Sequence, residues 1–522
     1  MSAARETGGT WRAAWPGGRS WSDGAAPWRV VLLWVAAALI SGFTARRYLG
    51  PLDEGVLLQA ASRIADGQWP WRDFGWAYGP GQPLAQLALG DSLLSWRIFR
   101  VAADATAAVL IWALVRNARP RWALPAWLAA AVTAAQPTSA NPTAPALAFA
   151  LGAVFLATRG RPAWAGALAA LAAFWRPDVG AIAALAAAAV FVAERRDRER
   201  AAGRGAAVGD NAAAGRGVAA GGDVATTSGP RAAVVTLVSA ALVGLALYAP
   251  FIVAAGPGTV WDALVVQATR DGEYWRLPFP DGFPGGDAKD FLQWLAPYGA
   301  LIVLVVAAVQ RRAVGLVVLG AGAAIYFLSR ADLEHAQGLL VVAAGLAAVI
   351  RPRLLGAALL AILIAVGVGN RASALLRPPD LVAFDSVRIP PEEAEALTKT
   401  IALVHELVPP GEPIYVAPRR SDLVSFSNPL LHRLTDRPNV LRRDVLLQAK
   451  PDEQAAIVAK LRQTRPRVII RWTDPASASR EPNARGRPSG SRALDEYIDA
   501  NYTLRARYGY YDVLASRSIA SR

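Results

Sequence analysis

The sequence contains no cysteine, one methionine and only three histidines among 522 residues. Without cysteine, the chain can form no disulfide, no thiolate metal site and no cysteine nucleophile. Charged residues are also scarce, at 18% of the chain, against about 25% in typical soluble domains. The chain carries no Gly-x-x-x-x-Gly-Lys-Ser/Thr, His-Glu-x-x-His or Gly-x-Ser-x-Gly motif. These absences argue against an ATP-driven pump, a zincin protease and an α/β-hydrolase.

What the chain has in abundance is apolar sequence. Hydrophobic residues make up 54% of it, more than a soluble globule could cover with its few polar side chains. Eleven apolar runs stand out, several of them shorter than the ~20 residues that span a bilayer. Because a bilayer offers the backbone no water to bond, we expect these runs to be membrane-crossing helices. They cover residues 28–44, 98–115, 122–135, 143–158, 163–175, 179–193, 232–255, 291–309, 313–328, 336–350 and 354–369.

The net charge of +15 would suggest nucleic acid in a soluble protein. Here the basic residues gather in the short turns on one side of the predicted spans, as the positive-inside rule requires of cytoplasmic loops. We therefore expect no nucleic-acid partner, and a multi-pass protein of the cell membrane with its N-terminus in the cytoplasm. Residues 1–27 are predicted to be disordered, and residues 28–370 to form the transmembrane domain, with a flexible cytoplasmic linker at 194–231.

The composition changes after residue 370, where no span-length apolar run remains. An odd number of spans places residues 371–522 outside the cytoplasm. Helical and strand periodicities alternate there. The helices are expected at 392–407, 452–463 and 491–501, and the strands at 413–417, 467–472 and 508–515. The predicted fold class is an α-helical polytopic membrane protein of about 11 spans with a small C-terminal extracytoplasmic α/β domain.

The first external loop, residues 45–97, concentrates charged and aromatic side chains. Asp53 and Glu54 stand just beyond the first span, Arg72 and Asp73 form a second charged pair, and Tyr78 belongs to an interfacial aromatic set. An isolated Asp-Glu pair is most simply explained by an Asp that caps a helix. The combination in one loop favours a functional site instead.

Two more charged clusters lie at the outer ends of later spans. Arg176 and Asp178 follow the fifth run, where they either anchor a helix start at the interface or belong to a site. The second cluster consists of Arg330, Asp332, Glu334 and His335. It is either an ordinary charged turn or a phosphate-binding group. One histidine and two carboxylates within four residues match no recognised metal-ligand spacing, so a requirement for a divalent cation is left open.

The segment DEGVLLQAASRIADGQWPWRDFGWAYGPGQPLAQL resembles the first external loop of the GT-C superfamily of polyprenyl-phosphate-dependent glycosyltransferases. It is most similar to bacterial members related to protein O-mannosyltransferases and lipid A aminoarabinose transferases. Those often carry Asp-Glu, then A-x-x-Φ-x-x-G-x-x-P-Φ-R-D, where Φ is apolar, then Y-x-P-G or K-P-P. The matching residues are Asp53, Glu54, Ala61, Ile64, Gly67, Pro70, Trp71, Arg72, Asp73, Tyr78, Pro80 and Gly81.

The resemblance implies an inverting transfer of sugar from a polyprenyl phosphate to a glycan, lipid or protein acceptor on the extracytoplasmic face. By similarity Asp53 is the candidate general base, with Glu54 second, because the acceptor hydroxyl must lose a proton as it attacks. The candidates for binding the donor phosphate are Arg72, Arg176, Arg330 and His335. Those for binding other parts of the substrates are Asp73, Tyr78, Asp178 and Glu334. Membrane lipids are expected to surround the spans.

A transporter or a flippase of lipid-linked sugars is the alternative. Such proteins place ionisable residues near the middle of the bilayer. In this sequence Arg100 and Asp104 are the main charged residues within the spans, whereas charges crowd at their outer ends. This distribution favours chemistry at the membrane surface.

Overall fold

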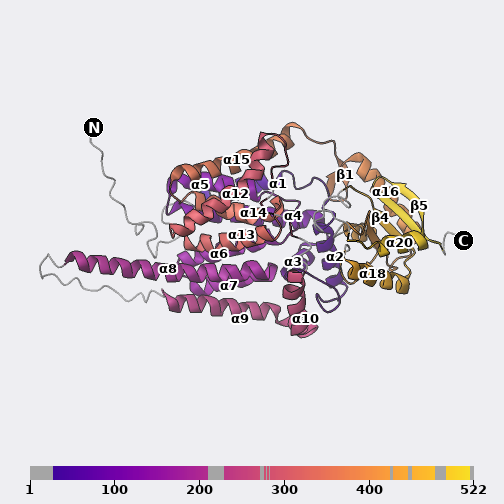
Figure 1. The fold of residues 1–522 in the computed structure, drawn as a ribbon, viewed down its shortest axis with the longest axis horizontal. Helices are drawn as coiled ribbons and strands as arrows, with labels where there is room; N and C mark the ends of the chain where they lie inside the picture. Colours follow the sequence, from indigo (N-terminus) through magenta and orange to yellow (C-terminus); the bar gives the residue numbers. More distant parts are fainter. Residues whose placement is uncertain are drawn as a thin grey trace.

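Figure 1 shows the fold in a computed structural model: a bundle of long helices with a smaller α/β domain beyond one end. The structure describes residues 27–209, 229–270, 276–277, 279–280, 282–423, 427–444, 450–475 and 489–517. The predicted disordered segment, up to residue 26, lies outside the described residues, as does 210–228 of the predicted linker.

Each of the eleven apolar runs coincides with a helix of the bundle. These helices are α1 (Pro27–Gly42), α4 (Leu93–Arg116), α5 (Pro120–Ala134), α6 (Thr143–Thr158), α7 (Pro162–Trp175), α8 (Pro177–Gly209), α9 (Pro230–Ala255), α12 (Ala288–Val309), α13 (Val314–Ser329), α14 (Leu333–Ala347) and α15 (Arg353–Leu376). Among the described residues, α4, α8, α9, α12 and α15 are long and apolar enough to cross a membrane, and α1, α6, α7, α13 and α14 are shorter apolar helices. The chain is thus a membrane protein by composition, while the count of about 11 spans stays a prediction.

Small residues bring the helices close together. α14 lies at the centre of the bundle, and all of its residues from Ala336 to Ala347 are buried. Gly166 of α7 faces α9 so closely that an added Cβ would lie 2.8 Å from the Cβ of Ser239. Backbones can approach this closely only where side chains are small, which explains the abundance of Ala and Gly in these helices.

The predicted flexible linker is in part wrong. α8 continues as a helix to Gly209, well past Glu194, where the linker was expected to begin. Ion pairs along the helix surface stabilise this extension, with Arg195 2.6 Å from Glu199 and Arg198 3.6 Å from Glu194. Both pairs have the spacing of four residues that joins neighbouring turns of a helix.

Two short helices, α2 (Asp53–Ala65) and α3 (Gly81–Leu89), lie between the bundle and the C-terminal domain (Figure 1). They belong to the first loop of the chain, between α1 and α4. On another part of the same end, α9 is followed by the one-turn helix α10 (Pro257–Trp261) and the π-helix η2 (Asp262–Val266). Short helices from two connecting segments of the chain therefore collect at this end of the bundle.

The C-terminal domain has a four-stranded sheet in the order β3-β4-β6-β5, with β3 parallel to β4 and the other pairs antiparallel. Its strands are β3 (Tyr415–Pro418), β4 (Val468–Trp472), β5 (Tyr502–Tyr508) and β6 (Tyr511–Ser516). Its helices are α16 (Pro391–Leu407), α17 (Leu430–Leu434), α18 (Pro451–Thr464) and α20 (Ala493–Asn501), and a hairpin of β1 (Val382–Phe384) and β2 (Val387–Ile389) precedes them. Alternate residues of the sheet pack into two separate clusters, so both faces are covered.

The expected helices and three expected strands of this domain are present, but β5 was missed. Its residues, YTLRARY, are mostly exposed or half-buried, and β5 is one of the two edge strands of the sheet. An edge strand needs no continuous apolar run, so the sequence pattern did not reveal it. The β1–β2 hairpin and α17 are too short to show a periodicity.

The C-terminal domain docks on α2. The backbone N–H of Leu430 donates a hydrogen bond to the carbonyl of Pro51 at 3.3 Å, and Arg63 lies 3.3 Å from the Asp444 carboxylate. At Gly55 an added Cβ would lie 2.7 Å from the Cα of Leu430, so only glycine permits this approach. The domain therefore contacts the helix that begins with the candidate base.

Candidate functional site

Asp53 is the first residue of α2 and is half-buried. Burial raises the pKa of its carboxyl to about 6, the charge of Glu334 adds to the rise, and the positive charges of His335 and Arg100 oppose it. A carboxyl with a pKa near neutrality can both accept and release a proton under physiological conditions. These interactions also place Asp53 within electrostatic reach of residues some 280 positions away, around the start of α14.

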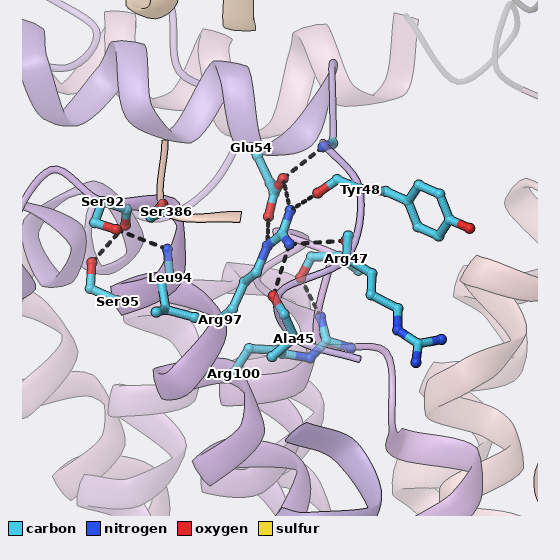
Figure 2. A network of polar contacts seen from close by, with 12 residues as sticks. Ala45, Arg47, Tyr48, Glu54, Ser92, Leu94, Ser95, Arg97, Arg100 and Ser386 are labelled. Atoms are coloured by element: carbon cyan, nitrogen blue, oxygen red, sulfur yellow. Dashed lines mark hydrogen bonds and ion pairs between the residues drawn. The ribbon is translucent and has the colours of Figure 1, made fainter. Parts of the chain in front are cut away.

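Glu54 lies in a closed polar network with Arg97 (Figure 2). The Arg97 guanidinium on α4 donates to both of its oxygens, at 2.6 and 2.7 Å, and the backbone N–H of Gly50 donates to it at 2.7 Å. Arg97 also donates to the carbonyls of Ala45 and Tyr48. Burial raises the pKa of Glu54, while the hydrogen bonds and the charge of Arg97 oppose that rise. The pair fastens the chain before α2 to the bundle.

Arg176 occupies the sharp turn between α7 and α8 and is buried. It donates to both oxygens of Asp178, at 3.1 and 2.7 Å, and to the hydroxyl of Thr143 at 2.9 Å. Its guanidinium carbon lies 4.1 Å from the centre of the Tyr326 ring and 5.7 Å from that of Tyr78. Burial alone would lower the pKa of Arg176, but the Asp178 carboxylate raises it above its usual value. The site therefore holds a permanent positive charge.

Tyr78 connects this arginine to Asp53. Burial raises the pKa of its phenol, and the charge of Asp53 raises it further, while Arg176 opposes the rise. Both groups thus lie within electrostatic reach of the same hydroxyl. Tyr78 is held in the first loop by an edge-on contact with Trp76, with ring centres 5.8 Å apart.

The turn between α13 and α14 also contributes charged residues to the site. Asp332 caps α14 by accepting the backbone N–H of His335 at 2.9 Å, and it lies 2.6 Å from the ring Nδ1 of His335 and 2.7 Å from Arg330. Burial would raise the pKa of Asp332, but the hydrogen bonds from His335 and Arg330 lower it. The His335 ring lies 4.8 Å from the ring of Tyr326, which joins this turn to Arg176. Glu334 is exposed at the same turn.

The structure brings most of the expected residues to one end of the bundle, where the Tyr326 ring lies against both Arg176 and His335. They come from α2, the first loop, the α7–α8 turn and the α13–α14 turn. The set comprises Asp53, Tyr78, Arg176, Asp178, Arg330, Glu334 and His335.

Arg72 and Asp73 have a different setting. They pair with each other at 2.7 Å and are solvent-accessible, and Arg442 of the C-terminal domain donates to their backbone carbonyls. Arg72 and Trp69 line a cavity of about 480 Å³ along α9, whose other walls are apolar. Nothing in these contacts connects Arg72 with Asp53, so its role at the donor phosphate stays a prediction.

No group of three His, Asp or Glu side chains suited to a metal ion occurs within the described part of the chain. Asp332 is already engaged by His335 and Arg330.

Several residues of this site were not identified from the sequence. Tyr326 was one of them, although it is the lone tyrosine in the apolar run 313–328 and lies near its outer end. Thr143 and Asn141 were others: Asn141 caps the start of α6 by accepting the backbone N–H of Thr143 at 3.0 Å, and Thr143 accepts from Arg176. The sequence signal that could have identified these residues is their position: each is a polar side chain at or near the outer end of an apolar run.

No protein-family model and no curated protein matches the chain. Solved structures do match. ArnT from Cupriavidus metallidurans in the apo state has 13% identity, covers 94% of this chain and 98% of its own, and has a TM-score of 0.51. The same protein bound to undecaprenyl phosphate gives 0.48 with the same identity and coverage. An Archaeoglobus fulgidus oligosaccharyltransferase tethered to an acceptor peptide shows 12% identity, 94% and 74% coverage and a TM-score of 0.47.

The likeness to apo ArnT shows that this chain shares the fold of that protein over nearly its whole length. At 13% identity the likeness speaks for the fold alone.

Proposed function

We propose that this protein is a membrane glycosyltransferase that moves a sugar from a polyprenyl-phosphate donor to an acceptor, with inversion. The observation that carries the proposal is the juxtaposition of Asp53, whose pKa is raised to about 6, with the buried guanidinium of Arg176 through the phenol of Tyr78. A proton acceptor and a fixed cation at one end of an apolar bundle are what such a transfer needs.

In the proposed step, Asp53 acts on the attacking acceptor hydroxyl and Arg176 on the leaving phosphate, on opposite sides of C1 of the sugar. The Asp53 carboxylate takes the proton of the acceptor hydroxyl while the hydroxyl oxygen attacks C1 of the sugar from the face opposite the phosphate. The bond between C1 and the phosphate oxygen breaks, and its electron pair leaves with the polyprenyl phosphate. Arg176 stabilises the charge that develops there. His335 and Arg330 are further candidates for the phosphate, and Tyr78, Asp178 and Glu334 for the sugar or acceptor.

We assign Glu54 a positioning role. Both of its carboxylate oxygens accept hydrogen bonds from Arg97, and its side chain is 1% exposed. A carboxylate held this way has no free oxygen to offer an acceptor hydroxyl. Asp53 therefore remains the favoured base of the two adjacent carboxylates.

The direction of the chain in the membrane follows from the same proposal. The site end of the bundle, with α2, α3 and the C-terminal domain, would face the extracytoplasmic side, and the basic turns at the other end would face the cytoplasm. The acceptor would be a glycan, lipid or protein reaching the site from outside.

The proposal is tested by Asp53→Asn in membranes that contain acceptors and receive a panel of radiolabelled polyprenyl-phosphate sugars. We expect transfer to fall by about 100-fold or more, since general base catalysis contributes on the order of 10²–10⁴. Asp66→Asn is the matched control, because Asp66 is an exposed carboxylate at the other end of α2. Unchanged transfer by Asp53→Asn, with equal amounts of folded protein, would remove Asp53 as the base.

The buried charges of α4, Arg100 and Asp104, do not favour the transport alternative. Arg100 donates to Asp104 at 3.0 Å, to Gln337 at 2.8 Å and to the carbonyl of Ser139 at 2.9 Å. Ser41 donates to the other oxygen of Asp104 at 2.8 Å. These groups bond one another and the backbone, which suits a structural role. Movement of lipid-linked sugar across liposomes without transfer would favour the alternative.

A further inference from the structure

The turns at the end of the bundle opposite the candidate site bring four arginines together. Arg119 lies in the turn from α4 to α5, and Arg312 in the turn from α12 to α13. Arg351 lies in the turn from α14 to α15, and Arg353 is the first residue of α15. α13 begins at this end and finishes at Arg330 of the site, and α14 returns, which fixes the two ends as opposite.

Hydrogen bonds between side chains and the backbone hold two of these turns against each other. Gln310 donates to the carbonyl of Arg351 and accepts the backbone N–H of Arg351 at 3.0 Å. Arg312 donates to the carbonyl of Val349 at 2.6 Å. The third turn is brought alongside because α5 packs against α15, and both helices start at this end.

Each of the four guanidiniums lies within electrostatic reach of at least one other. Burial lowers the pKa of Arg119, and the charges of Arg351 and Arg353 lower it further. Burial also lowers the pKa of Arg312, again with contributions from Arg351 and Arg119. Such repulsion costs free energy that an anion placed among the guanidiniums would recover.

The backbone adds positive potential at the same place. α5, α13 and α15 all begin here, and none of the three has a side chain that caps its first turn. Uncapped N–H groups at helix starts attract negative charge and supplement the arginines. The positive-inside rule accounts for basic residues in these turns, but it does not require three turns to converge.

Apolar side chains lie directly beside the arginines. Leu354 follows Arg353 and is 80% exposed, and Val309, one residue before the turn of Arg312, is 78% exposed. A soluble anion would gain nothing from these surfaces, whereas acyl chains attached to a phosphate would cover them.

We propose that the arginine cluster of Arg119, Arg312, Arg351 and Arg353 binds the phosphates of an anionic diphosphate phospholipid of the cardiolipin type. The two phosphates lie between the three turns, and the acyl chains lie along the starts of α5 and α15. Basic pockets between membrane helices recognise this chemistry. The site is separate from the proposed transfer reaction and does not depend on it.

The test is native mass spectrometry of the delipidated full-length protein titrated with cardiolipin, with phosphatidylcholine and with inorganic pyrophosphate. We expect cardiolipin to bind in preference to phosphatidylcholine, and Arg351→Gln/Arg353→Gln to weaken its binding by about 30-fold, because each of the two basic residues contributes roughly five- to sixfold. Arg351→Lys/Arg353→Lys keeps both charges and should retain most of the binding.

The matched control is Arg159→Gln/Arg161→Gln, which removes two charges from the α6–α7 turn at the same end of the bundle. Equal loss in the two glutamine variants would overturn the proposal, because it would indicate a diffuse surface charge. Equal binding of cardiolipin and phosphatidylcholine would overturn it too. A third contrary result is that pyrophosphate binds as tightly as cardiolipin and loses its binding in Arg351→Gln/Arg353→Gln. That result would overturn the lipid proposal, because it would show that the cluster binds a soluble anion.

Discussion

Arg97 on α4 and Glu54 on α2 meet through two hydrogen bonds of 2.6 and 2.7 Å, and both side chains are almost completely buried. The pair joins the first loop to the helix bundle directly beside Asp53. Because Glu54 is the neighbour of the candidate base, the ion pair fixes where α2 begins and hence where Asp53 stands. Figure 2 shows how this contact encloses the Glu54 carboxylate.

We expect Glu54→Leu to destabilise the protein by about 3–5 kcal/mol, because it leaves the buried charge of Arg97 without its partner. Arg97→Met should have a similar effect. The double variant should be more stable than either single one, since no unpaired charge remains. Thermal unfolding followed by tryptophan fluorescence measures all three. Single variants as stable as the wild type would show that the pair contributes little.

The ring of Tyr326, rather than its hydroxyl, should matter for transfer. The guanidinium of Arg176 lies over this ring, whereas the phenol oxygen accepts only a long hydrogen bond of 3.4 Å from Asn141. Tyr326→Leu removes a desolvated cation–π contact of about 2 kcal/mol, which corresponds to about 30-fold in rate. Tyr326→Phe keeps the ring and should stay within a few-fold of wild type. The comparison is made on initial rates of sugar transfer; equal loss in both variants would assign the effect to the hydroxyl.

Transfer should depend on pH through Asp53, whose pKa is raised to about 6. As a base, Asp53 acts only when deprotonated, so kcat/KM should level off above about pH 7 and fall about tenfold per unit below pH 6. The measurement is a pH profile from 4.5 to 8 at constant ionic strength, with protein integrity checked at each pH. A flat profile between pH 5 and 7 would contradict the assignment.

Gly55→Ala should disturb the docking of the C-terminal domain on α2. Its methyl group would lie 2.7 Å from the Cα of Leu430, so α2 and α17 must separate. We expect a lower unfolding temperature together with slower transfer, because Asp53 lies two residues away. Gly258→Ala is the control, since a Cβ at Gly258 meets open space. Wild-type stability and transfer in Gly55→Ala would show that the contact between α2 and α17 tolerates an added methyl group.

The helices of the bundle were predictable because each depends on a local property. A long apolar run in a bilayer has one way to satisfy its backbone, and that way is a helix. The same reasoning found Asp53 and Arg176 as candidates, since charges beside apolar runs are visible in the sequence. It failed at Glu194, where ion pairs between successive turns extend α8 through a segment expected to be flexible.

The sequence by itself determined that this chain is a helical membrane protein with charged groups at the ends of its helices, because hydrophobic runs and their flanking charges act locally. Only the tertiary structure decided which charges meet. Glu54 pairs with Arg97, Asp53 lies within electrostatic reach of Glu334 and His335, and Tyr326 joins Arg176 to a turn about 150 positions away in the chain. Those meetings depend on how helices distant in sequence pack against one another, which no local pattern encodes.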